Sequence, residues 1–171
     1  MTRELLDRAL VEEASKKSGL VWVKGAGAAA ARALWHVWHD GAVCLVGDGP
    51  GEQPLEALVD GGSAEVTVRS KDKGGRLVTF PATVSELPSG SAEWEAAVAE
   101  LKGKRLNAPD GERMPARWAR ECRVLRLAPA GPVAPLPDGS LAERPVATPA
   151  TTRKPVPAGL PRLLMKRRKR R

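Results

Sequence analysis

The stretch that most constrains the fold runs from residue 33 to residue 46 and reads A-L-W-H-V-W-H-D-G-A-V-C-L-V. Its Asp40-Gly41 dipeptide is typical of a two-residue type I′ turn, because both central residues of that turn need a positive φ. The apolar runs on either side of the turn therefore predict a β-hairpin. A two-residue loop fixes the register, with Trp38 opposite Val43 and His36 opposite Leu45.

Both faces of the predicted hairpin are apolar. One face carries Leu34, His36, Trp38, Val43 and Leu45, and the other carries Trp35, Val37, Cys44 and Val46. Such a hairpin is expected to be central, with core on one side and a helix, a partner chain or a ligand on the other.

Periodicity predicts the remaining elements. One helix follows Thr2, with an apolar face of Leu5, Leu6, Ala9, Leu10 and Ala14. A second follows Ser91 and carries an apolar stripe of Trp94, Ala97, Val98 and Leu101, and a third covers residues 114–120. Further strands are expected at residues 20–23, 64–69, 77–86 and 122–127, with Pro81 at a sheet edge or a bulge. Six strands with flanking helices predict a mostly β protein, a small closed or half-open barrel.

The positive charge of the chain is confined to its C-terminal segment. Residues 128–171 hold ten basic and two acidic residues, which accounts for the whole net charge of +8. Residues 1–127 hold 18 of each sign and are neutral. The predicted organisation is a folded domain at residues 1–127 followed by a tail at 128–171.

Nine prolines lie in the 44 residues of that tail, which predicts an extended or disordered segment. It ends in the polybasic run Lys166, Arg167, Arg168, Lys169, Arg170 and Arg171. This run could attract nucleic acid or another polyanion, strongly at low salt. There are two other interpretations. The tail could be solvated without a dedicated partner, or Leu163 to Met165 could make a weak membrane contact.

Few other features point to chemistry. Cys44 and Cys122 lie in predicted strands among apolar neighbours, which favours buried thiols in a reducing compartment. Two histidines and two cysteines without paired spacing predict no metal site, and no nucleophile elbow or P-loop occurs. We therefore name no catalytic residue. The absence of a signal peptide and of a long apolar run predicts a cytoplasmic protein without a transmembrane segment.

The run L-W-H-V-W-H-D-G-A-V-C-L-V-G-D-G resembles the second and third strands of the flavin-binding split β-barrel proteins. That family includes the pyridoxamine 5′-phosphate oxidases and the actinobacterial flavin and deazaflavin oxidoreductases. The resemblance covers roughly residues 3–127 and implies a six-stranded split β-barrel. It also implies a homodimer with the flavin in a groove at the dimer interface.

The resemblance further implies which residues contact an FMN or deazaflavin cofactor. The ring system would lie near Trp35, His36, Val37 and Trp38, and loop and strand residues would hold the phosphate. The candidates for that second role are Gly47, Asp48, Gln53, Arg69 and Lys71. The chain departs from the family at Glu52, an acid where many relatives carry a cation.

Two functional hypotheses follow. The first is a homodimeric flavin- or deazaflavin-binding barrel, an oxidoreductase acting on an unknown small molecule, in which the cofactor performs the chemistry. The alternative is a dimeric barrel that has lost its cofactor and docks on a polyanion through residues 166–171.

Overall fold

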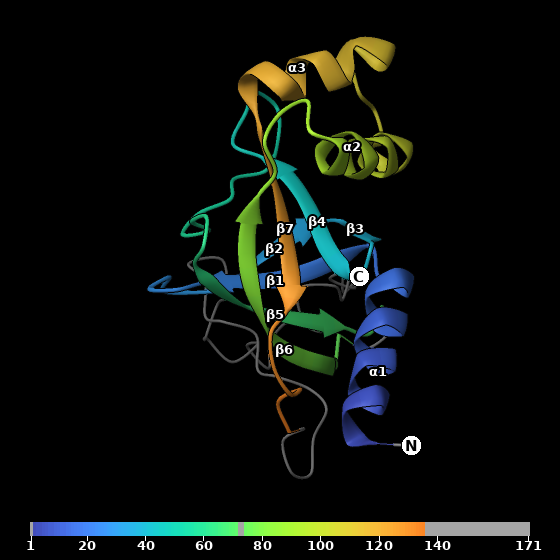
Figure 1. Cartoon of the computed structure of the whole chain (residues 1–171), viewed down its shortest axis with the longest axis vertical. Coiled ribbons are helices and arrows are strands. Elements are labelled where there is room, and N and C mark those ends of the chain that lie inside the picture. The colour runs from blue at the N-terminus through green and yellow to red at the C-terminus, as the bar shows by residue number, and fades with distance from the viewer. Residues whose placement is uncertain (1, 72–73, 136–171) are drawn as a thin grey trace, which may run out of the picture.

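The structure, a computed structural model, describes residues 2–71 and 74–135 (Figure 1). It contains three α-helices, a short 3₁₀ helix at Gly111–Arg113 and seven strands. The helices are α1 (Arg3–Lys17), α2 (Ala92–Lys104) and α3 (Met114–Glu121). The strands are β1 (Leu20–Gly25), β2 (Arg32–Trp35), β3 (Val37–His39), β4 (Ala42–Gly47), β5 (Ser63–Arg69), β6 (Arg76–Glu86) and β7 (Arg123–Pro129).

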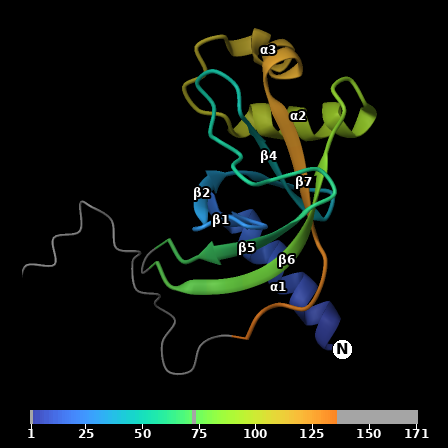
Figure 2. The ribbon, with the colours of Figure 1, turned by 90° about the vertical axis from the view of Figure 1, so that its left-hand side faces the viewer.

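The strands form one antiparallel sheet in the order β2-β1-β5-β6-β7-β4-β3. The sheet curls into a half-barrel, so that long strands such as β6 bend around the interior (Figure 2). Its two end strands, β2 and β3, follow each other in the chain with only His36 between them. The fold is mostly β with flanking helices, as the sequence predicts.

The hairpin at Asp40-Gly41 forms with the predicted turn and register. Asp40 has a φ of 45° and Gly41 a φ of 72°, the pair of positive values that a type I′ turn requires. Trp38 pairs with Val43, and β3 and β4 are antiparallel. The pairing ends at Val37, however, and His36 is not in a strand. The structure therefore has seven strands where six were expected, because the strand predicted before the turn is interrupted at His36.

Both faces of the hairpin are covered. Leu34, Val43 and Leu45 belong to the core inside the curled sheet. Val37, Cys44 and Val46 belong to a second cluster, built with α2 and α3 outside the sheet. Figure 1 shows these two helices together at one end of the molecule, over β4 and β7. The prediction of a central hairpin is wrong for β3, which is the end strand of the sheet.

Pro81 does not lie at an edge, because β6 has β5 on one side and β7 on the other. The register shift in the β5–β6 pair lies between Val68 and Arg69, away from Pro81. Pro81 is tolerated because β7 ends beside it: Ala82 pairs with Pro129, the last residue of β7. Ala130 then donates its N–H to the carbonyl of Pro81. The missing N–H of Pro81 points toward this same side, where the ladder stops.

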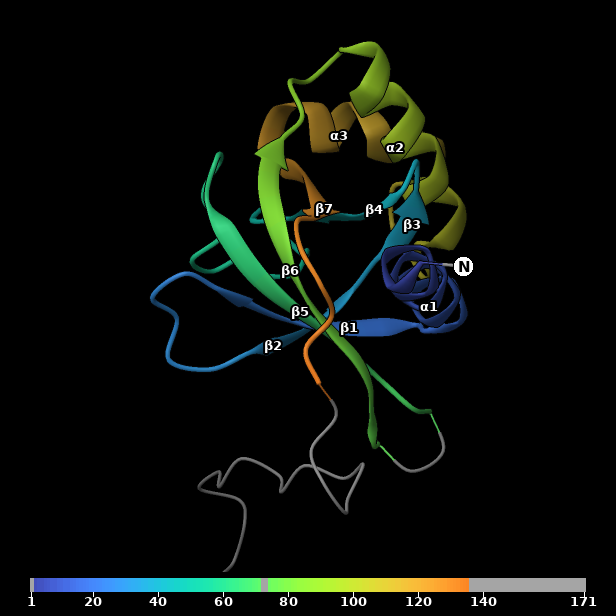
Figure 3. The ribbon, with the colours of Figure 1, turned by 60° about the horizontal axis from the view of Figure 1, so that its bottom comes forward.

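The predicted apolar face of α1 is only partly correct. The buried residues are Val11, Ala14 and Ser15, whereas Leu5, Leu6 and Leu10 are 45–54% exposed. The helix contacts β3 and β6, and Figure 3 looks nearly along its axis, with β3 beside it. By contrast, α2 begins after Ser91 and buries Trp94, Ala97, Val98 and Leu101, as expected.

The chain after β7 stays with the barrel as far as the structure describes it. Ala134 donates to the carbonyl of Thr79, and Val133 packs against the inner core. The division after residue 127 remains a prediction, and Lys166 to Arg171 lie outside the described residues. In the described part of the chain, no helix combines the length and the apolar character that crossing a membrane requires.

Candidate functional site

Gln53 lies in the loop after β4, where the sequence places a candidate cofactor contact. Its Oε1 accepts a hydrogen bond from the N–H of Trp35 at 2.9 Å, and its Nε2 donates to the carbonyl of Trp35 at 2.9 Å. Nε2 also donates to the carbonyl of Val46 at 3.1 Å. Both donor hydrogens of the amide are thus engaged by main-chain groups.

These bonds explain the break in the hairpin. The register of β3 and β4, continued by two residues, would place Trp35 opposite Val46. The Gln53 amide occupies that position and binds main-chain groups of both residues, which replaces the direct ladder bonds. The residue therefore fixes where β2 separates from β3.

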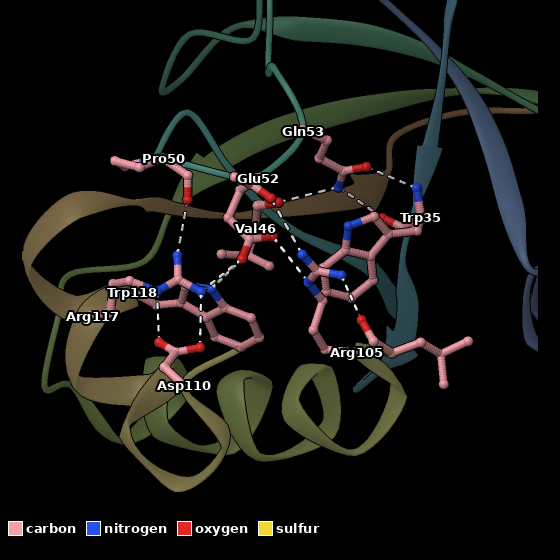
Figure 4. A network of polar contacts seen from close by, with 11 residues as sticks. Trp35, Val46, Pro50, Glu52, Gln53, Arg105, Asp110, Arg117 and Trp118 are labelled. Atoms are coloured by element: carbon pink, nitrogen blue, oxygen red, sulfur yellow. Dashed lines mark hydrogen bonds and ion pairs between the residues drawn. The ribbon is translucent and has the colours of Figure 1, made fainter. Parts of the chain in front are cut away.

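Glu52 is the buried centre of a polar network (Figure 4). Its side chain has no exposed surface. Oε1 accepts from Arg117 at 3.0 Å and from the indole N–H of Trp118 at 3.1 Å, while Oε2 accepts from Arg105 at 3.2 Å. A buried carboxylate needs such partners to offset the loss of water. Glu52 thus attaches the loop after β4 to α2 and α3.

Arg117 and Arg105 each make further contacts besides the one with Glu52. Arg117 also binds Asp110 through Nε at 2.7 Å and donates to the carbonyl of Pro50 at 3.2 Å. Hydrogen bonds to Asp110 and Glu52 raise the pKa of Arg117 above its ordinary value. Arg105 lies over the ring of Trp35, 5.8 Å from the centroid. The network leaves no carboxylate oxygen of Glu52 for a ligand.

Gly47 and Asp48 also have structural roles. A Cβ on Gly47 would lie 2.2 Å from the carbonyl oxygen of Gln53, so the loop packs too closely for any side chain. The Asp48 carboxylate accepts from the N–H of Leu55 at 2.7 Å and from Arg123 at 3.1 Å. Asp48 and Glu52 thus bind the arginines near this loop, which are engaged in ion pairs within the chain.

The candidates His36, Val37 and Trp38 point into packed regions. The His36 Nε2 is 2.9 Å from the Ser15 carbonyl oxygen, and burial lowers the pKa of the ring to about 4. The neutral ring therefore donates from Nε2, and its Nδ1 has no partner among the described residues. Val37 is 1% exposed, and Trp38 packs against the inner core.

Asp48 and Arg69, with Lys71 two residues after it, are connected to opposite ends of β6. Arg69 pairs with Arg76, the first residue of β6. Asp48 binds Arg123, which binds Glu86, the last residue of the same strand. The 11 residues of β6 lie between these two positions, along a strand that curves around the barrel. Asp48 and Arg69 therefore contact opposite ends of the same strand.

Trp22 is a residue that the sequence analysis missed. The guanidinium of Arg69 lies 4.8 Å from the centroid of its ring, a cation–π contact. The signal was available: in β1, buried Val21 and Val23 alternate with Leu20, Trp22 and Lys24, so Trp22 points out of the barrel.

Trp35, Leu20 and Arg69 share this outer face with Trp22. Leu20 pairs with Trp35 across β1 and β2, and Trp22 pairs with Thr67 across β1 and β5. Continuing the second register by two residues places Leu20 beside Arg69. Trp35 and Arg69 thus lie two strands apart, roughly 10 Å. Leu20 is 49% exposed, which leaves an open apolar surface between them. We name Leu20, Trp22, Trp35 and Arg69 the outer sheet face.

Both cysteines are free thiols, Cys44 buried and Cys122 partly buried. Burial raises the pKa of Cys44 to about 11, so it is not a nucleophile. Within residues 2–71 and 74–135, no group of three or more metal-ligating side chains is placed to hold an ion.

Comparison with known proteins identifies the fold. No protein-family model matches the sequence. No curated protein matches it either. Among solved structures, the heme storage protein HutZ of Vibrio cholerae is similar, with a TM-score of 0.53 and 13% identity over 72% of this chain and 90% of that chain.

A stress-family protein of Xanthomonas campestris has a TM-score of 0.50 and 15% identity over 86% of this chain and 99% of that chain. The FAD- and heme-binding protein of Mycobacterium smegmatis is a weaker match, with a TM-score of 0.43, 16% identity and 94% of both chains covered. The first two similarities show that this chain has a split-barrel-like fold.

Proposed function

We propose that the protein binds a flavin or deazaflavin on the outer sheet face and is an oxidoreductase or flavin carrier. The observation that carries the proposal is the arrangement of Arg69 on the ring of Trp22, next to exposed Leu20. An apolar surface with an aromatic ring and a nearby guanidinium suits a planar ring system that carries a phosphate.

The chemistry of this face fits such a cofactor better than the Gln53 loop does. Arg69 ends β5, and Lys71 follows in the next turn, so two cations lie at one end of the face. In the loop, the donors of Gln53 are engaged, and the neighbouring arginines are paired with Glu52 and Asp48. We therefore assign Arg69 and Lys71 to the phosphate and Trp22 and Leu20 to the ring system, because the ring of Trp35 already contacts Arg105 and Trp118. A bound flavin would supply the hydride chemistry.

A second copy of the chain belongs to the proposal. The outer sheet face is open in one chain, and an isolated apolar face of this kind is costly in water. A homodimer would cover it and enclose the cofactor between subunits. The sequence resemblance to flavin-binding split barrels supports the same arrangement.

Heme is a less suitable ligand, although HutZ stores it. A histidine side chain is a common axial ligand of heme iron. Neither histidine belongs to the outer sheet face: His36 is buried with its Nε2 bonded to Ser15, and His39 ends β3 next to the Asp40-Gly41 turn. Polyanion binding through Lys166 to Arg171 stays a second hypothesis, without a structural observation in its favour.

The test compares FMN with riboflavin, which lacks the phosphate. Titration of the full chain is followed by quenching of flavin fluorescence. If Arg69 holds the phosphate, Arg69→Gln weakens FMN binding by about 10- to 100-fold, and riboflavin binding is unchanged. Arg120→Gln is the control, because Arg120 is an exposed arginine of α3.

Two results would contradict the proposal. One is a full chain that binds none of FMN, FAD and deazaflavin. The other is an Arg69→Gln variant that binds FMN as tightly as the Arg120→Gln variant does.

A further inference from the structure

A groove of about 1080 Å³ lies between α1, the turn after β3 and the chain around the end of β7. Its apolar lining includes Val11, Trp38 and Val133, and Leu5 on its rim is 54% exposed. The residues of the outer sheet face do not line it. This groove is therefore separate from the surface proposed for the cofactor.

The groove is acidic. Its charged lining residues are four acids, Glu4, Asp7, Glu12 and Asp40, and two arginines, Arg8 and Arg126. Arg126 donates to the carbonyl of Asp40 at 2.8 Å, and Glu12 pairs with Lys16. Glu4, Asp7 and Arg8 form no ion pair with the described residues. The six charged lining residues, four acids and two arginines, leave a net charge of −2, which attracts a cation beside an apolar surface.

We propose that this groove holds the C-terminal segment of the same chain, residues 160–171. The segment reads L-P-R-L-L-M-K-R-R-K-R-R. Leu163 to Met165 would contact the apolar lining, and the cations from Lys166 onward would face Glu4 and Asp7. An arginine can also stack on the ring of Trp38. The segment therefore matches the groove in both hydrophobicity and charge.

The tether begins a few residues after the groove. Pro132 and Val133 line the groove, and the carbonyl of Pro135, the last described residue, accepts a hydrogen bond from Arg76 at 2.9 Å. Only residues 136–159 separate that point from the proposed segment. This linker contains five prolines, so it is stiffer than a Gly/Ser chain and reaches up to roughly 75 Å. It keeps its end at an effective concentration of up to roughly a millimolar. A segment with an intrinsic affinity of only about 100 μM would then be docked about nine-tenths of the time.

Docking would withhold the six cations at residues 166–171 from other partners. The surface of residues 1–127 is neutral in formal charge, so polyanion binding by this protein depends on whether the tail is docked or free. The inference does not depend on cofactor binding.

The first test is zero-length carbodiimide cross-linking of the full chain at low salt, with the linked peptides identified by mass spectrometry. The amines of Lys166 and Lys169 should couple to Glu4 or Asp7 in excess over the exposed Glu95 and Glu100 of α2. Mixing ¹⁴N- and ¹⁵N-labelled chains identifies links within one chain. Equal coupling to the α2 acids, or links only between chains, would overturn the proposal.

The second test measures heparin affinity of two variants with the same net charge. Glu4→Gln combined with Asp7→Asn should release the tail and raise the affinity of the full chain by up to about tenfold, since the competent fraction rises from about one-tenth. Glu95→Gln combined with Glu100→Gln is the matched control. Circular dichroism confirms that both fold. Equal heparin affinity of the two variants would refute docking in this groove.

Discussion

The side chain of Gln53 binds both main-chain polar groups of Trp35, accepting from its N–H and donating to its carbonyl at 2.9 Å each. The same amide reaches the Val46 carbonyl, so one side chain takes the place of a ladder rung between β2 and β4. The sheet can therefore separate here without leaving these main-chain groups unpaired.

Replacing Gln53 with methionine keeps the length of the side chain but removes its three hydrogen bonds. The main-chain groups of Trp35 and Val46 would lose their partners in a partly buried place, so we expect a loss of about 3 kcal/mol in the free energy of unfolding. Urea denaturation measures it. Glu100→Met, on the exposed side of α2, should change stability by less than about 0.5 kcal/mol. Equal stability of the two variants would show that the Gln53 bonds contribute nothing.

The Glu52 network gives a second prediction. Glu52→Gln preserves shape but leaves Arg105 and Arg117, both largely buried, without their carboxylate. Removing the carboxylate from such a network should lower the free energy of unfolding by about 3 kcal/mol. Glu112→Gln is the same substitution in an exposed pair with Lys102 and should cost less than about 0.5 kcal/mol. Denaturation curves of the two variants that coincide with that of the wild type would contradict the structural role of Glu52.

Close packing at Gly47 predicts that its replacement by alanine is severe. A Cβ would lie 2.2 Å from the carbonyl oxygen of Gln53 and 2.7 Å from Cγ of Leu55. We expect Gly47→Ala to lower the free energy of unfolding by more than about 3 kcal/mol. Gly103→Ala is the control: a Cβ there meets nothing within 4 Å, and its place in α2 should make alanine stabilising by up to about 1 kcal/mol. Thermal unfolding of Gly47→Ala and Gly103→Ala measures these two changes in stability.

His36 predicts a pH dependence of stability. Its pKa is lowered to about 4 in the folded chain by burial, against about 6.5 when unfolded. Below pH 6.5 the unfolded state therefore binds a proton that the folded state does not. The contribution of His36 to the free energy of unfolding is therefore complete above pH 6.5. It falls by about 3 kcal/mol as the pH drops to 4.

The control for His36 is His36→Met, which cannot titrate in this range. The free energy of unfolding of the wild type, minus that of this variant, should decrease between pH 6.5 and 4. Glutamate and aspartate titration cancels in the difference. A difference that is constant over this pH interval would mean that His36 is not buried as a neutral ring.

The sequence predicts the parts of the fold that depend on local rules. The Asp40-Gly41 turn, the two apolar faces of the hairpin and the stripe of α2 all follow from φ preferences and periodicity. The burial of Val11 rather than Leu5 and Leu10 depends on which side of α1 meets the barrel. Periodicity does not determine that contact, because leucines on both sides satisfy it.

The candidate site was harder to predict for a similar reason. The sequence predicts Gln53 as a ligand contact and marks Glu52 only as a departure from the family. The partners of both residues come from β2, α2 and α3, up to 66 residues away. Such long-range pairing leaves no local pattern. Trp22 was missed although its alternation with Val21 and Val23 shows that it points outward. Alternation of buried and outward-pointing residues within a short apolar strand therefore identifies a residue such as Trp22.

Native mass spectrometry of the full chain, before and after incubation with FMN, FAD and deazaflavin, tests the central claim most directly. We expect a homodimer, a species of twice the mass of one chain, that retains the added cofactor. The Trp22→Leu variant should lose the cofactor mass, whereas Trp94→Phe, in the core under α2, should keep it. A single-chain species that gains no mass with any of the three cofactors would contradict the account.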